Sequence, residues 1–71
     1  MKSVLIAHHD CQKYAETLSS ELDGLEVLLA DGLKVVDEAA LAKAHIILGL
    51  GPGFNEKVIG AARNVEWIQS L

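Results

Sequence analysis

The chain has 71 residues, of which 51% are hydrophobic, and a formal net charge of −4 with histidine neutral. This length allows one small domain. The sequence has no cluster of Lys or Arg residues, which argues against a nucleic-acid partner and against binding to an anionic membrane surface. No apolar run approaches the roughly 20 residues that a membrane helix needs. The one cysteine, Cys11, excludes an internal disulfide, and with no export signal ahead of the first apolar run it predicts a cytoplasmic location.

The first predicted element is a strand over residues 4–7, because a short continuous apolar run is typical of a parallel strand that is buried on both faces. A helix follows, since apolar side chains recur at helical spacing from Cys11 to Leu22. Asp10 is a good N-cap for this helix. Gly24 suits the left-handed position just after the end of a helix.

The second strand is expected over residues 25–29, followed by a turn and a short helix over residues 38–43. Asp37 is the expected N-cap of this helix. Acidic residues at its start and Lys43 near its end have the charge order that the helix dipole favours.

A third strand is expected over residues 45–48, then a glycine-rich loop at 49–53, a helix capped by Asn55 and a fourth strand over residues 65–71. Strands that alternate with helices predict a parallel sheet with right-handed crossovers and helices on both faces. We therefore expect an α/β fold, a flavodoxin-like doubly wound parallel sheet in the order β-α-β-α-β-α-β. We also expect it to be incomplete, because the last strand ends without a turn or a cap.

The loop at residues 49–53 lies between a strand and a helix and invites a dinucleotide-binding interpretation, which its sequence contradicts. Phe54 stands where the fingerprint needs its third glycine, and Pro52 has no N–H to offer a phosphate. The glycines and the proline therefore favour a tight turn. A second interpretation stays open, in which backbone N–H groups line a pocket for a small carboxylate. The residues that offer these groups are Leu50, Gly51 and Gly53.

Residues of metal-binding type follow the first strand: His8, His9, Asp10 and Cys11. Adjacent residues at an extended strand end point in opposite directions, so we expect them not to converge on one ion and predict no metal site. One of the histidines can still line a cleft, because ligands bind at the carboxyl ends of the strands in such sheets.

Three other residues have simple structural interpretations. His45 lies at the opposite end of the third strand from the usual ligand side, so we expect it to be structural or exposed. Cys11 fits a small core residue. Trp67, the only tryptophan, is expected to pack in the core; a solvent-facing Trp67 would instead indicate a partner surface. No carboxylate pair stands out as a general acid and base, and no Ser-His-Asp order is present, so the sequence predicts no catalytic residue.

Three segments of the chain, residues 2–6, 44–49 and 62–71, resemble the beginning of the D-isomer-specific 2-hydroxyacid dehydrogenases. The last segment is the most specific. It is similar to a family strand that leads into a Gly-Val-Asp loop, with Val65 and Glu66 in place of the commoner Leu and Lys.

The resemblance implies that residues 1–71 are the N-terminal portion of a flavodoxin-like substrate-binding domain. The parent enzyme, expected to be a homodimer, would reduce small 2-keto acids with NADH or NADPH in a cleft against a separate cofactor domain. The family's catalytic Arg, Glu and His and its cofactor loop belong to later parts of its sequence, so this chain alone is expected to bind no dinucleotide and to be inactive. The cleft-lining loop maps onto four substrate-binding residues: Leu50, Gly51, Pro52 and Gly53.

The alternative is a small non-enzymatic flavodoxin-like interaction module. A phosphorelay receiver is disfavoured within this alternative, because it needs an acidic pair after the first strand and an aspartate after the third. The chain has only Asp10 at the first place and Gly49 at the second.

Overall fold

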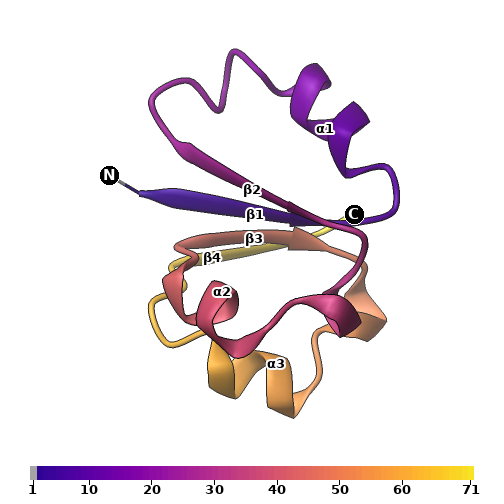
Figure 1. Ribbon diagram of the computed structural model, residues 1–71, viewed down its shortest axis with the longest axis vertical. Helices are drawn as coiled ribbons and strands as arrows, with labels where there is room; N and C mark the ends of the chain where they lie inside the picture. The colour runs from indigo at the N-terminus through magenta and orange to yellow at the C-terminus, as the bar shows by residue number, and fades with distance from the viewer. Residues whose placement is uncertain (1) are drawn as a thin grey trace.

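The computed structural model describes residues 2–71 and contains one four-stranded sheet with helices on both faces (Figure 1). The strands are β1 (Ser3–Ala7), β2 (Glu26–Ala30), β3 (Ile46–Gly49) and β4 (Trp67–Ser70). The α-helices are α1 (Cys11–Thr17), α2 (Glu38–Lys43) and α3 (Glu56–Ala61). Two single turns of 3-10 helix are η1 (Leu33–Val35) and η2 (Gly51–Gly53). None of the helices in this part of the chain is long and apolar enough to cross a membrane.

The strands are all parallel and lie in the order β2-β1-β3-β4. This is the flavodoxin-like order through the fourth strand. Val4 on β1 aligns with Val27 on β2 and with Ile46 on β3, so the three strands share one register. The predicted α/β doubly wound parallel sheet is therefore confirmed.

Strand β1 is the buried centre of the molecule, and all five of its residues are at most 2% exposed. Its side chains alternate between two cores. Leu5 and Ala7 face α2 and α3, whereas Val4 and Ile6 face α1. The continuous apolar run in the sequence therefore reflects burial on both faces, as expected for a central parallel strand.

Side-chain caps begin two of the helices where the sequence predicts them. The Asp37 Oδ1 atom accepts a hydrogen bond of 2.8 Å from the Ala40 N–H at the start of α2. The Asn55 Oδ1 atom accepts one of 3.0 Å from the Val58 N–H at the start of α3. Each cap satisfies a backbone donor that has no partner within its helix.

Helix α1 begins at Cys11 after the predicted N-cap residue Asp10, but it ends earlier than predicted. It ends at Thr17, and the chain continues to Gly24 in turns. Leu18 and Leu22 still pack on the α1 face of the sheet, which explains their helical spacing; the serines between them favour turns over helix. The Asp10 side chain does not cap the helix. Gly24 has the predicted left-handed backbone, with φ of 83°.

Strand β4 contradicts the expectation that Trp67 packs in the core. The Trp67 side chain is 62% exposed, and all four residues of β4 are exposed. Trp67 is the register partner of Ile46, whose side chain packs on the α1 face. Helix α1 contacts β1 and β2. It therefore covers the β1–β2 side of this face and leaves Trp67 on β4 exposed to solvent.

Polar contacts stabilise the end of the sheet at which β1 and β3 begin. His45 Nδ1 accepts a hydrogen bond of 3.1 Å from the Ser3 N–H, and Ser3 Oγ donates to the Lys43 carbonyl. The Lys2 ammonium donates to the Glu66 carboxylate and holds the pKa of that carboxyl below its usual value. The expected structural role of His45 is confirmed.

Replacing Ile47 with alanine tests the role of the β1–β3 core. Ile47 is fully buried on the face that α2 and α3 cover, so Ile47→Ala should lower the free energy of unfolding by about 2–5 kcal/mol. Val35→Ala is the control, because Val35 is 70% exposed and its loss should change stability by no more than about 0.5 kcal/mol. Urea unfolding followed by circular dichroism measures both, and equal effects would contradict this packing.

Candidate functional site

The sheet has one topological switch point, between β1 and β3. The chain passes from β1 to β2 on one side and from β3 to β4 on the other, and the connecting helices lie on opposite faces (Figure 1). Ala7 and Gly49, the last residues of the two strands, are register partners. In open parallel sheets the crevice outside these strand ends is where ligands bind.

A pocket of about 350 Å³ lies at this point, and we call it the strand-end pocket. Its volume is at the lower end of the range for small-molecule sites. Its lining comes from the segments that follow three strands. These residues are Ala7 at the end of β1 with His8 and His9 after it, Asp31, Gly32, Leu33 and Lys34 after β2, and Leu50, Pro52 and Gly53 after β3.

Three of the four loop residues singled out in the sequence line this pocket, and Gly51 does not. The Gly53 N–H donates to the Leu50 carbonyl at 2.9 Å inside the η2 turn, so the expectation that it is free for a ligand is wrong. Within residues 2–71, neither the Leu50 nor the Gly51 N–H donates to a backbone carbonyl. Pro52 sits in the first turn of η2, where its fixed φ favours the turn.

Two glycines allow the loop after β3 to pack closely on η1. A Cβ atom on Gly53 would lie 2.8 Å from Leu33 Cδ1, and one on Gly49 would lie 3.0 Å from the same atom. Leu33 is 6% exposed and belongs to the core under α2 and α3. The tight-turn interpretation of the loop therefore has a specific cause, which is contact with the Leu33 side chain.

The two histidines after β1 lie in a turn, and the expectation that they diverge is wrong. Strand β1 ends at Ala7, and residues 8–10 form a bend and a turn, so the alternation of an extended strand does not apply to them. The His8 and His9 rings stack with centroids 4.2 Å apart. Ligand-type atoms of His8, His9 and Asp10 all lie within 4.8 Å of one another.

A hydrogen bond opposes metal binding at this cluster. The Asp10 N–H donates to His8 Nδ1 at 3.0 Å, so Nδ1 is occupied and unprotonated. In a neutral imidazole the proton then lies on Nε2, and neither nitrogen of His8 is available to an ion without loss of this bond. The Asp10 carboxylate lies 3.3 Å from His9 Nε2 and does not cap α1. The arrangement fits a metal ion poorly.

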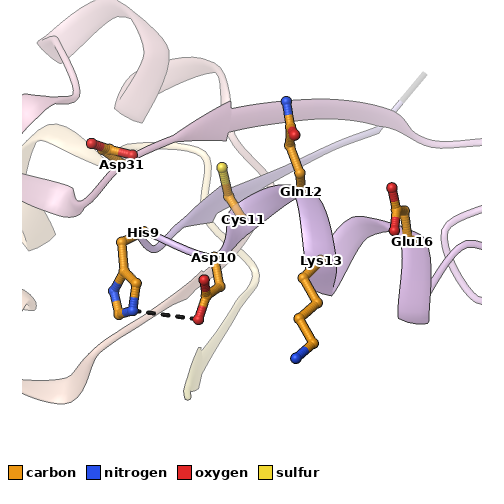
Figure 2. Close-up of a pocket in the computed structure, with 7 residues that line it drawn as sticks. All are labelled: His9, Asp10, Cys11, Gln12, Lys13, Glu16 and Asp31. Atoms are coloured by element: carbon orange, nitrogen blue, oxygen red, sulfur yellow. Dashed lines mark ion pairs between the residues drawn. The ribbon is translucent and has the colours of Figure 1, made fainter.

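A second hollow, of about 530 Å³, lies beside the start of α1 (Figure 2). Its side chains do not converge: Lys13 points to the opposite side of α1 from Gln12, and Glu16 lies farther along α1, well apart from Asp31 (Figure 2). It has three carboxylates and one lysine, so it favours neither an anion nor an apolar ligand. Cys11 lines it and is half-buried against the α1-side core. The lining residues are His9, Asp10, Cys11, Gln12, Lys13, Glu16 and Asp31.

The strand-end pocket is therefore the better candidate site. Its polar side chains are His8, which is buried, and three exposed residues, His9, Asp31 and Lys34. The rest of the lining is apolar or backbone. Sequence reasoning missed the contribution of residues 31–34, although the rule that ligands bind beyond strand ends applies equally to the segment after β2.

Comparison of the chain with protein-family models, with curated proteins and with solved structures gives no match.

Alanine substitution of two glycines tests the Leu33 contact. Gly53→Ala should lower the free energy of unfolding by about 1–3 kcal/mol, because the new Cβ atom overlaps the Leu33 side chain. Gly60→Ala is the matched control: Gly60 lies in α3 with nothing within 4 Å of its Cβ position, so alanine should raise stability by up to about 1 kcal/mol. Urea unfolding distinguishes the two, and a neutral or stabilising Gly53→Ala would contradict the contact.

Proposed function

We propose that the chain is the N-terminal part of the substrate-binding domain of an NAD(P)-dependent 2-hydroxyacid dehydrogenase. In this proposal the strand-end pocket forms one wall of the cleft that receives a small 2-keto or 2-hydroxy acid. The observation that carries it is the position of Leu50, Pro52 and Gly53. The segment that resembles the family's cleft-lining loop lines a pocket at the switch point of the sheet.

Three features of the pocket support a small acid as the ligand. Its volume of about 350 Å³ leaves ample room for a molecule of a few carbon atoms. Its apolar side chains, Leu33 and Leu50 among them, exclude water from a ligand's carbon atoms. Lys34 supplies a positive charge for a carboxylate, while Asp31 in the same lining disfavours ligands with more than one negative charge.

The residues of this chain do not fit the nicotinamide cofactor that the proposed reaction requires. The loop after β3 has no free N–H at Gly53 and none at Pro52. At the start of α3 the Asn55 side chain occupies the Val58 N–H, and Glu56 adds negative charge where a phosphate would bind. Cofactor binding and hydride transfer therefore belong to other residues of the parent enzyme, and the role proposed for this chain is to bind and orient the acid.

A second candidate function is a protein-interaction module, and the exposure of Trp67 favours it. An exposed tryptophan on an uncovered strand is the kind of residue that is enriched at protein interfaces. The two candidates differ in what they require of the natural polypeptide, because only the dehydrogenase needs a cofactor domain.

The first test is the intact mass of the natural polypeptide that carries this N-terminus. We expect a species several times heavier than 7.6 kDa that oxidises NADH or NADPH when glyoxylate or hydroxypyruvate is added and not when acetate is added. A stable natural species of 7.6 kDa would contradict the dehydrogenase and leave the interaction module.

A charge placed in the pocket tests its role within that enzyme. Leu50→Asp should raise the KM for glyoxylate about tenfold, because the new carboxylate repels the anionic substrate; Leu50→Asn, of the same size without the charge, should have a smaller effect. Ile59→Asp is the matched control, since Ile59 on α3 has a similar exposure, 45% against 48%, but does not line the pocket. Equal KM values for Leu50→Asp and Ile59→Asp would exclude the pocket from substrate binding.

A further inference from the structure

His8 is a buried side chain whose second nitrogen has no role in the fold. The residue is 8% exposed, and its Nδ1 atom accepts the hydrogen bond from the Asp10 N–H. The ring is held by the stacked His9 ring and by the edge-on Tyr14 ring, whose centroid is 5.1 Å away. His8 is therefore a rigid group, and its orientation is fixed before any ligand arrives.

The hydrogen bond at Nδ1 determines what the other nitrogen offers. A neutral imidazole with Nδ1 as an acceptor carries its proton on Nε2. Among residues 2–71, no side-chain or backbone acceptor lies within hydrogen-bond distance of His8 Nε2. The Nε2 atom is not one of the fully buried unpaired side-chain atoms of residues 2–71, so it is open to the pocket, where water or a ligand accepts its hydrogen bond.

We propose that the His8 Nε2–H group is a preorganised donor that binds an oxygen atom of the acid in the strand-end pocket. His8 lines this pocket together with Leu50 and Gly53. A ligand with an acceptor oxygen, a carboxylate or a keto group, replaces the water at this donor. The identity of the ligand as a 2-keto acid rests on the proposed function, whereas the tautomer of His8 does not.

The charged groups of the pocket agree with this assignment. Lys34 lies in the same lining and attracts a carboxylate, while the neutral His8 ring adds direction without adding charge. Asp31 also lines the pocket but makes no hydrogen bond to His8, so its carboxylate does not already fill the role of the acceptor. His9 also lines the pocket, but it is exposed and lies beside the Asp10 carboxylate, so it is less fixed than His8.

The test is a nuclear magnetic resonance titration of the 15N-labelled protein with sodium glyoxylate. We expect His8 in the Nε2–H form before addition, and a shift of its Nε2 resonance together with the Leu50 and Gly51 amides on binding. An Nδ1–H tautomer would overturn the assignment of His8 while leaving the dehydrogenase proposal intact. Glyoxylate that binds without moving His8, or that does not bind at all, would also overturn it; the activity of the natural enzyme tests the dehydrogenase separately.

Two substitutions distinguish the effect of the Nε2 donor on binding from the effect of the shape of the side chain. His8→Asn keeps an oxygen near the Nδ1 position but loses the Nε2 donor, and should weaken glyoxylate binding about fivefold. His8→Gln can place an amide N–H near the Nε2 position and should recover part of that loss. Ile59→Asn is the control, because Ile59 is exposed and does not line the pocket, and it should leave the affinity unchanged. An equal loss in His8→Asn and His8→Gln, with the fold intact by circular dichroism, would contradict a role for the donor.

Discussion

The burial of β1 on both of its faces is the constraint on which the rest of the structure depends. Because β1 lies between β2 and β3, its side chains supply both cores, and helices have to cover both faces. Right-handed crossovers then send α1 to one face and α2 and α3 to the other (Figure 1). At the ends of β1 and β3 the chain departs in opposite directions, and the strand-end pocket lies there.

The end of the sheet where the strands begin differs from the end where they stop, and this difference suits a wall that binds a ligand. Where the strands begin, hydrogen bonds from Ser3 and Lys2 join the start of β1 to His45 and Glu66, which directly precede β3 and β4. Where they end, the glycine loop packs on Leu33 and forms a firm apolar wall. Into this wall His8 brings one polar group whose direction is set by the fold. In the proposed enzyme, the role of this site is to bind and orient the small acid.

The sequence was informative wherever one local rule decided the structure. Alternating strands and helices predicted the sheet, and Asp37 and Asn55 predicted two helix starts, because each cap depends on residues three positions away. The predictions that were wrong depended on where an element ends. Strand β1 ends one residue before His8, and this alone changes two diverging histidines into a stacked pair. Trp67 is exposed because α1 is short and lies over β1 and β2, which no pattern within β4 could reveal.

The central claim is that a small 2-keto acid occupies the pocket formed by the segments after β1, β2 and β3. Nuclear Overhauser contacts from the methyl group of 13C-labelled pyruvate to the protein test it most directly. The account predicts contacts to the side chains of Leu33, Leu50 and Ala7, all of which line the pocket. Contacts to the exposed face of β4 around Trp67, with none to these three residues, would contradict it.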